Sequence, residues 1–226
     1  MKAKLSSIVF ASVLSLLLFS SSAVEAQGWA IEVGPAYNIQ KGTFVAPCGC
    51  TFADGYGLGL IGSVSASFFS LGGFSVGLGT GVDVQKFTSH EVDPATLLQY
   101  ANGDQEEIKL AYVNIDPYIR YQIPGTGLFF QVSPGIDYLV SSSFNHIAGA
   151  VAVEDTTISF NPTDAVDIHK ASYHAKVSVG YSFGLLGMAL EPSIYAKQPL
   201  SNLSAAATDE WHVTTLYAAL AIRFGL

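Results

Sequence analysis

The sequence predicts an all-β protein, an eight-stranded antiparallel up-and-down transmembrane β-barrel with short periplasmic turns and long extracellular loops. Half of the 226 residues are hydrophobic and 12% are charged, which excludes a disordered chain. The 22 glycines, 14 phenylalanines and 11 tyrosines favour strands and tight turns over helices. Apolar residues alternate with small or polar residues in eight segments, and short and long connections between these segments alternate along the chain.

Residues 1–26 are predicted to be a secretory signal peptide, which leaves 27–226 as the barrel domain. Lys2 and Lys4 precede the apolar run Leu5–Phe19, and small residues around Ala26 suit cleavage after that position. The apolar run is shorter than the roughly 20 residues that a spanning helix needs, which argues against an uncleaved membrane anchor. No later segment is apolar over the roughly 18 residues that would indicate a transmembrane helix.

The eight strands are predicted from a period of two. In Phe74–Gln85 the even positions hold Phe, Val, Leu, Thr, Val and Val, whereas the odd positions hold Ser, three Gly, Asp and Gln. A helix would not sort residues in this way. Each segment is long enough to cross a bilayer as a tilted strand. The other seven segments, in chain order, are Trp29–Ile39, Leu58–Phe68, Val113–Tyr121, Leu128–Tyr138, Tyr173–Phe183, Met188–Ala196 and Leu216–Leu226.

The connections predict an outer-membrane barrel rather than a soluble sandwich. Three are the short turns Ser70-Leu71-Gly72, Pro124-Gly125-Thr126 and Gly184-Leu185-Leu186. The other four are long, at about 40–56, 88–109, 141–170 and 199–212. Short turns on one side, long loops on the other and an even strand count are typical of barrels whose chain starts and ends in the periplasm.

Aromatic residues near both ends of the strands predict the two interfacial girdles of such a barrel. An aromatic core inside a soluble barrel is the alternative, and it would place the small and charged residues outside. The proposed girdle residues are Trp29, Phe68, Phe74, Tyr121, Phe130, Tyr181, Phe183 and Phe224 near the short turns, and Tyr37, Phe87, Tyr138, Tyr173 and Trp211 near the long loops.

Four prolines stand in mid-strand on the apolar face, where each removes a donor from the hydrogen-bond ladder. They are Pro35, Pro117, Pro134 and Pro192, and all four lie at a similar depth. Bulges or local gaps are therefore expected at these positions.

Four segments resemble the small outer-membrane β-barrel proteins called porin-family, which are distantly like the OmpA membrane domain. These segments are Tyr112–Ile123, Phe130–Val140, Leu190–Leu203 and the ending Leu216–Leu226. The ending is similar to the assembly signal of such barrels, although its last residue is Leu rather than an aromatic. The resemblance implies an outer-membrane location, with membrane lipid and the barrel-assembly machinery as partners, but it implies little about function.

The charges argue against nucleic acid as a partner, because a net charge of −8 repels a phosphate backbone. Many acidic residues fall in the long loops, where Lys41, Lys86, Lys109 and Lys170 accompany them. A solvated surface is the simplest interpretation, and attraction of divalent cations is the alternative. The loop acids are Asp54, Glu91, Asp93, Asp104, Glu106, Glu107, Glu154, Asp155, Asp164, Asp167, Asp209 and Glu210.

No cofactor or metal site is predicted. Gly57–Gly62 matches the dinucleotide fingerprint, but the residues after it alternate as a strand instead of opening a helix. Cys48 and Cys50 are predicted to form a strained local disulfide, with a reactive thiol pair as the alternative. The five histidines lack the spacing of a metal pair and are interpreted as loop or rim residues: His90, His146, His169, His174 and His212.

The inward face carries five acidic and four basic residues that nearly neutralise one another. Glu32, Arg120, Glu191 and Arg223 are predicted to form one layer near the short turns, in which Arg223 bridges both Glu191 and Glu32. Deeper in the barrel lie the remaining charges, Asp116, Lys176, Asp83, Asp137 and Lys197.

The function predicted is a structural or surface-interaction role in the cell envelope, without enzymatic activity. Eight strands enclose an interior just wide enough for side chains, which argues against a general pore. A narrow passive channel is the alternative, favoured by the inward glycines Gly57, Gly59, Gly77, Gly79 and Gly81. A lipid-modifying enzyme comes third, because no strand shows a recognisable nucleophile motif.

Overall fold

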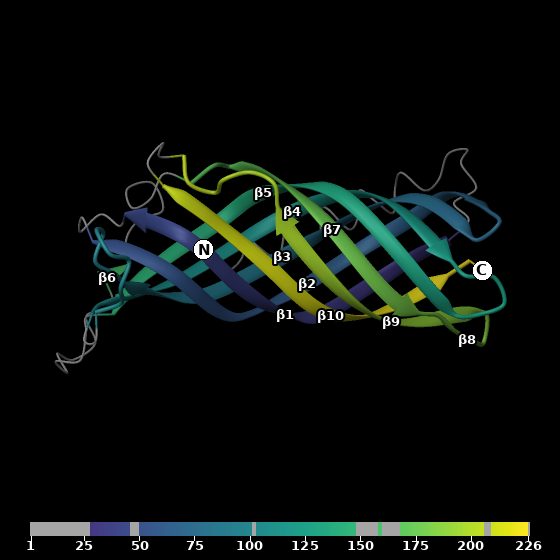
Figure 1. The fold of residues 1–226 in the computed structure, drawn as a ribbon. Helices are drawn as coiled ribbons and strands as arrows, with labels where there is room; N and C mark the ends of the chain where they lie inside the picture. Colours follow the sequence, from purple (N-terminus) through teal and green to yellow (C-terminus); the bar gives the residue numbers. More distant parts are fainter. Residues whose placement is uncertain are drawn as a thin grey trace.

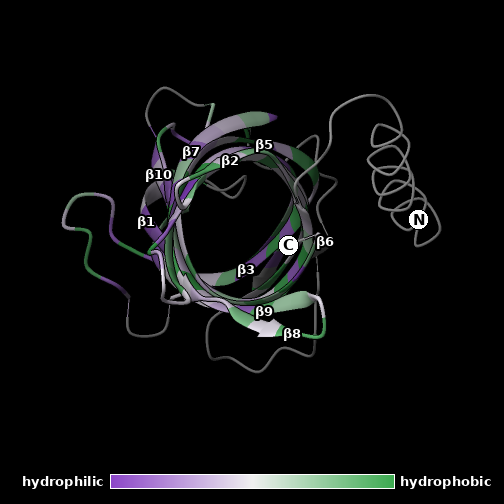
Figure 2. Cartoon of the chain, turned by 90° about the vertical axis from the view of Figure 1, so that its right-hand side faces the viewer, coloured by the Kyte–Doolittle hydropathy of each residue, from purple (hydrophilic) through white to green (hydrophobic). Residues whose placement is uncertain are grey.

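The strands form one closed ring (Figures 1 and 2). The computed structural model describes residues 28–45, 50–100, 103–147, 158–159, 168–205 and 209–225. The signal peptide predicted for 1–26 and the residue Cys48 lie outside these ranges. The strands are β1 (Gly28–Val45), β2 (Thr51–Leu71), β3 (Phe74–Glu91), β4 (Gln105–Gln122), β5 (Leu128–Ile147), β6 (Ile158–Ser159), β7 (Ala171–Tyr181), β8 (Phe183–Leu185), β9 (Met188–Pro199) and β10 (Glu210–Phe224).

The described strands make a barrel of eight staves, where a stave is one full-length position in the ring. Strands β7 and β8 are two pieces of one stave, which is interrupted at Ser182. Both pieces pair with β9, β9 pairs with β10, and β10 pairs with β1, so the ring has no free edge. The pairings between neighbouring staves are antiparallel, and β6 is a short addition to β5. The predicted eight-stranded antiparallel barrel is confirmed. No helix among the described residues is long and apolar enough to span a membrane.

The two faces of the staves have the predicted parity. On β1, Ile31 and Val33 are about half exposed on the outside, whereas Ala30 and Ala36 are buried inside. On β3 the even positions Phe74, Val76 and Leu78 are exposed, while Asp83 is completely buried. Hydrophobic side chains therefore cover the outside of the ring and most charged strand residues point inward.

The staves are longer on the long-loop side than the sequence predicts. Residues 40–56 are not a long loop, since β1 continues to Val45 and β2 begins at Thr51. A shift in pairing register between Gln40 and Thr43 interrupts the period of two, and Asp54 has a positive φ of 40° in this stretch. The extension was missed because Lys41 and Thr43, the outward residues that follow Ile39, are polar, so the apolar alternation ends before the strand does.

The short turns lie within one or two residues of the predicted positions. Gly72 and Gly73 connect β2 to β3 with φ values of 58° and 90°, and Leu186 and Gly187 connect β8 to β9 with φ values of 50° and 80°. Two consecutive positive φ values match the type I′ turn, whose twist suits a tight hairpin. The end of the barrel with these turns also holds the end of β10 (Figure 1).

The mid-strand prolines interrupt three ladders. Pairing between β1 and β10 jumps from Val33↔Leu220 to Ala36↔Tyr217, which leaves out Pro35. Pairing between β4 and β5 jumps from Ile115↔Ile136 to Ile119↔Val132, the stretch that holds Pro117 and Pro134. Pro192 lies opposite Leu220 within an unbroken register on the β10 side, but on its other side the pairing of β9 jumps from Gly180↔Ser193 to Phe183↔Leu190 and leaves Pro192 out. The expected gaps are present at all four prolines.

Candidate functional site

The barrel interior is the candidate functional site, and it changes in character along the barrel. An apolar cluster fills the long-loop end, a network of ion pairs fills the middle, and a second ionic group lies near the short turns. The packing of these three groups determines how much free space the lumen has.

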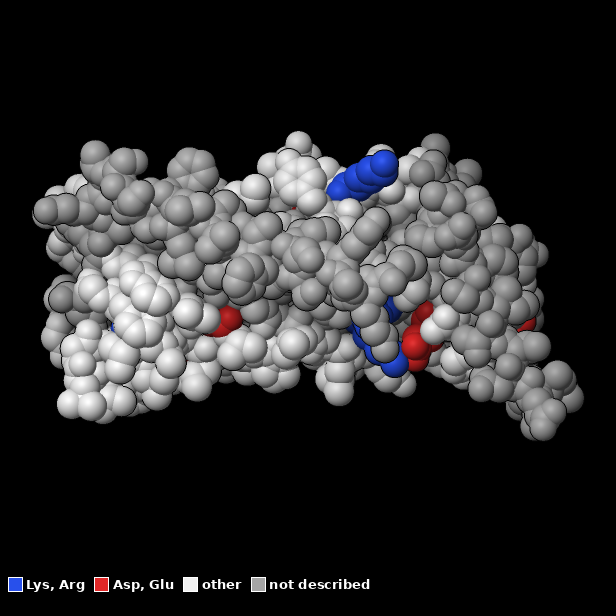
Figure 3. Space-filling view, turned by 180° about the vertical axis from the view of Figure 1, so that it is seen from behind, with Lys and Arg blue, Asp and Glu red and all other residues white. Residues whose placement is uncertain are grey.

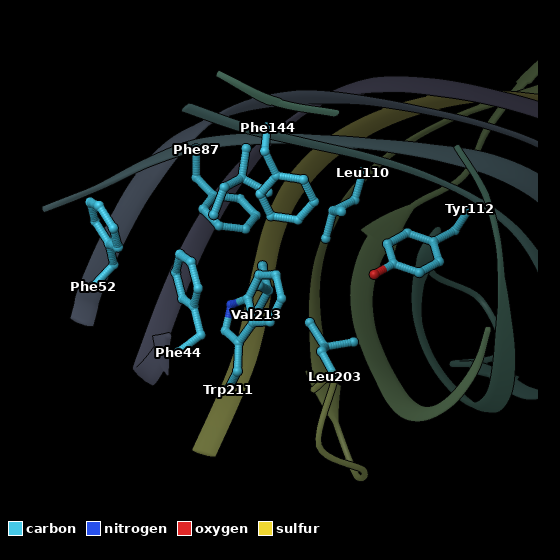
Figure 4. Packing of buried hydrophobic residues seen from close by; sticks show 10 residues of the cluster. Phe44, Phe52, Phe87, Leu110, Tyr112, Phe144, Leu203, Trp211 and Val213 are labelled. Carbon is cyan, nitrogen blue, oxygen red and sulfur yellow. The ribbon is translucent and has the colours of Figure 1, made fainter. Parts of the chain in front are cut away.

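The apolar cluster consists of inward-facing side chains from several staves (Figure 4). Phe44 stacks on Phe52 and on Trp211, with ring centroids 5.6 Å and 4.9 Å apart, and Phe87 meets Trp211 edge-on at 6.3 Å. Phe44, Phe52 and Trp211 come from the adjacent strands β1, β2 and β10, and Phe87 on β3 reaches Trp211 past two intervening strands, so the rings fill the interior at this end. Its members are Phe44, Phe52, Phe87, Ile108, Leu110, Tyr112, Phe144, Leu203, Trp211 and Val213.

Two members of this cluster correct the girdle prediction. Phe87 and Trp211 were expected at the membrane interface, but they are 1% and 0% exposed and point inward. Parity on their strands gives the reason: Phe87 is odd-numbered like the inward Asp83 on β3, and Trp211 is odd-numbered like the inward Tyr217 on β10. Extending the alternation past the apolar segments would have placed both rings inside.

The described residues 202–205 of the connection between β9 and β10 pack against the cluster. Leu203 inserts into the cluster, its backbone N–H donates to the carbonyl of Trp211, and its own carbonyl accepts from His169. The amide oxygen of Asn202 accepts from the backbone N–H of Trp211 at 2.9 Å. These bonds hold Leu203 in the opening of the barrel.

The middle of the barrel contains a continuous chain of ion pairs. Lys176 contacts Asp116, and Asp116 Oδ1 lies 2.8 Å from His174 Nε2. On its other side His174 Nδ1 lies 3.0 Å from Asp137 Oδ2, at ion-pair distance but without hydrogen-bond geometry. The chain continues through Lys197, whose Nζ lies 2.8 Å from Asp137 and 2.9 Å from Asp83.

His174 is a charged-network residue of the interior that sequence reasoning missed. It was interpreted as a loop or rim residue, yet it is 1% exposed and joins the two aspartates at the centre of the chain of ion pairs. Its even number on β7 matches the inward Lys176, so parity was the available signal. Gly135 on β5 faces it, and a Cβ there would lie 2.5 Å from His174 Nε2.

The ionic group near the short turns is centred on Glu191. Arg120 donates two hydrogen bonds of 2.7 Å to the two oxygens of Glu191, and Arg223 Nε donates a third at 3.1 Å. The Arg120 guanidinium also lies 3.7 Å from the centre of the Phe129 ring. A bidentate arginine–carboxylate pair combines strong attraction with fixed geometry.

Glu32 takes a different part from the one predicted. Its carboxylate accepts hydrogen bonds from the hydroxyls of Tyr195 and Ser63. Arg223 was expected to bridge Glu191 and Glu32, and the structure pairs it with Glu191. At Glu32 the hydroxyl of Tyr195 takes the position that was expected for the Arg223 guanidinium. Tyr195 in turn stacks on Tyr217 at 4.4 Å, which fixes its ring.

The two cavities found between these groups in the described part of the interior are small. The interior cavity beside Glu32 and Arg120 measures about 30 Å³ and the one beside His174 about 10 Å³. A single water needs roughly 10–15 Å³ measured in this way, so each cavity holds one or two waters at most. A wider recess of about 220 Å³ lies at the short turns, and Arg120 is among its lining residues.

The inward glycines make room for neighbouring atoms instead of a water file. A Cβ on Gly77 would lie 2.4 Å from the ring of Tyr118, and one on Gly59 would lie 2.8 Å from the Asn38 amide nitrogen and 2.2 Å from a backbone oxygen. Gly79 is more open, with its nearest atoms at 3.6 Å. The observation that favoured a narrow channel therefore has a packing explanation.

The remaining motifs carry no site in the described part of the chain. Gly57–Gly62 lies within β2, as its alternation indicates. The described His, Cys, Asp and Glu residues form no group of three or more that could hold a metal ion. Of the acids predicted to lie in the long loops, Asp54 is on β2 and pairs with Lys41 at 3.6 Å, and Glu107 is on β4 and pairs with Lys86 at 2.8 Å. Glu154, Asp155, Asp164 and Asp167 lie outside the described residues.

No protein-family model and no curated protein sequence matches this chain. Among solved structures it is similar to Neisserial surface protein A, with 8% identity over 88% of this chain and 97% of that chain and a TM-score of 0.44. It is also similar to the attachment invasion locus protein Ail of Yersinia pestis, with 12% identity, 87% and 98% coverage and a TM-score of 0.39. A third similar structure is the outer membrane protease OmpT from Escherichia coli, with 8% identity over 90% of this chain and 98% of that chain and a TM-score of 0.41. These values identify no role for this chain, and its fold rests on its own strand pairings.

Proposed function

We propose that this chain is an outer-membrane β-barrel with a closed interior, and that its role in the cell envelope is structural or surface-interacting rather than that of a pore or an enzyme. The observation that carries this proposal is the combination of an apolar outer surface with an interior filled by side chains. The apolar outer surface suits a lipid environment. The side chains that fill the interior argue against a path for solutes.

The outer surface supports a membrane location. Large apolar side chains such as Leu58, Ile119, Val132 and Ile194 are more than half exposed, and similar residues occur on the staves all around the ring. A soluble barrel would bury such residues and expose its charges, whereas this barrel buries Asp83, Glu191 and other charges. Over the span in which all eight staves pair, closure of the ladder leaves no unpaired strand edge, which a bilayer requires.

The interior supports a closed barrel. The cluster around Trp211 blocks the long-loop end, and Leu203 lies in its opening. Below it, the ion pairs from Lys176 to Asp83 cross the lumen, and the two cavities measured there are each only large enough for one or two waters.

The location is tested by expression with the natural leader and fractionation of the envelope. We expect the chain in the outer-membrane fraction and, when purified, a shift in gel migration after boiling, because a closed barrel resists detergent until it is heated. Recovery as a soluble periplasmic monomer would overturn the membrane assignment.

The closed state is tested separately in planar bilayers. We expect no steady single-channel current from the purified, heat-modifiable protein, and no mass change in lipids incubated with it. A stable current would favour the narrow passive channel, and a covalently altered lipid would favour the lipid-modifying enzyme.

A further inference from the structure

Two lysines lie directly opposite each other on the outside of the barrel. Lys86 of β3 pairs in register with Lys109 of β4. Their chain neighbours Phe87 and Leu110 are buried in the interior, so both lysine side chains point outward. Like charges at directly opposed positions in a sheet repel each other, because their Cβ atoms are only about 5 Å apart.

This pair lies at the upper boundary of the apolar surface. On the short-turn side the next outward pairs are Val84↔Ala111 and Val82↔Val113, which are apolar. On the long-loop side the next outward pair is Thr88↔Glu107, which is polar. The lysines therefore lie where a membrane's hydrocarbon would give way to headgroups.

The charges around the pair leave a net positive site. Glu107 Oε2 lies 2.8 Å from Lys86 Nζ and offsets one of the two lysines. Among the described residues, no salt bridge is formed by Lys109, which is exposed. On the face drawn in Figure 3, basic and acidic side chains lie beside one another toward the long-loop end, on an otherwise weakly charged described surface.

An apolar surface adjoins the lysines on β2. Tyr56 and Leu58 are 62% and 71% exposed. Because Tyr56 pairs with Thr88 and Leu60 pairs with Val84, this part of β2 runs alongside Lys86. A ligand held here would therefore meet cationic groups and bare hydrocarbon at once.

We propose that Lys86 and Lys109 bind the phosphate of a lipid in the outward-facing leaflet, with the lipid's acyl chains against Leu58 and the apolar rows below. A phosphate has several acceptor oxygens, so it can accept hydrogen bonds from two ammonium groups on neighbouring strands at once. The bound anion also offsets the repulsion between the two lysines. This inference rests on the proposed membrane location. A lipid is favoured over a free anion because the site is continuous with the apolar outer surface.

The test uses the full mature barrel folded in detergent micelles, with lipid A as the probe and chemically dephosphorylated lipid A as the matched lipid. Native mass spectrometry measures the fraction of protein carrying one lipid. We expect the K86Q/K109Q variant to bind lipid A about tenfold or more weakly than the unaltered chain, since two charge-assisted contacts are lost. Dephosphorylated lipid A should bind both proteins equally weakly.

Two further variants sharpen the test. K41Q is the matched control, because Lys41 is an exposed lysine on β1 that already pairs with Asp54, and lipid A binding should not change. E107Q removes the carboxylate that competes for Lys86, so lipid A binding should become tighter.

Equal binding of lipid A by the unaltered chain and K86Q/K109Q would overturn the site. Displacement of lipid A by an equimolar amount of inorganic phosphate would also overturn it, by showing a site for the free anion. Failure of the chain to form a heat-modifiable barrel or to enter phosphatidylcholine vesicles would instead refute the membrane location on which the inference rests.

Discussion

Arg120 on β4 and Glu191 on β9 form a bidentate ion pair across the interior of the barrel, with both hydrogen bonds 2.7 Å long. Their side chains are only 4% and 2% exposed. Strands β4 and β9 are not neighbours in the ring, so this pair ties together staves that the backbone ladder does not connect.

Breaking this pair should destabilise the barrel strongly. Arg120→Ala leaves the Glu191 carboxylate with Arg223 as its remaining cation, and loss of one partner of a buried pair costs roughly 3–5 kcal/mol. Guanidinium unfolding of the protein in lipid vesicles measures the loss. Lys41→Ala is the control, because its exposed pair with Asp54 should contribute at most about 1 kcal/mol. Similar losses for both variants would contradict a special role for the buried pair.

Gly135→Ala should disrupt the middle of the network. The new Cβ would lie 2.2 Å from Asp116 Oδ1 and 2.5 Å from His174 Nε2, so that the contact between these two groups has to give way. Overpacking of this kind typically costs about 1–3 kcal/mol in unfolding free energy. Gly79→Ala is the matched control, since its nearest atoms are 3.6 Å away and the change should be nearly neutral. The proposed packing at Gly135 is wrong if both variants unfold at the same denaturant concentration.

Leu78→Arg should damage assembly, because Leu78 is on the outer surface of β3, which the proposed location places against lipid. A charge facing the middle of the bilayer costs roughly 2–4 kcal/mol. Gly79→Ser, one position along and on the inner face, should be tolerated. The heat-modifiable fraction recovered from outer membranes measures both variants. Equal damage would mean that the inner and outer faces have been exchanged.

Trp211→Ala should loosen the closure at the long-loop end. The ring is completely buried and stacks on Phe44, so its removal leaves a cavity and costs roughly 3–5 kcal/mol. If the apolar cluster is the seal, brief current steps should also become detectable in planar bilayers. The substitution Tyr37→Ala, on the outward face of β1, should leave the current at zero. Loss of stability without any current would assign the closure to the ion pairs below.

The local sequence was sufficient for the architecture. A period of two depends only on which residues succeed one another, and it correctly identified the outward faces of β1 and β3, the three short turns and the even stave number. It also placed Arg120 and Glu191 inside at the same depth, because the rise along a strand is nearly constant. Prolines without an N–H donor gave the ladder gaps beside Pro35 and Pro117.

Tertiary structure alone decided how the interior is used. Strand spacing gives the depth of a charge but not the angle at which a long side chain crosses the lumen, so the partner of Arg223 and the hydrogen bond from Tyr195 to Glu32 followed only from packing. His174 becomes a link between two aspartates because β4, β5 and β7 bring together residues far apart in the chain. The same reason holds for the apolar cluster around Trp211, since Phe44 and Trp211, whose rings stack, come from strands at opposite ends of the sequence. Alternation is a property of one strand, whereas closure of the interior is a property of all eight staves together.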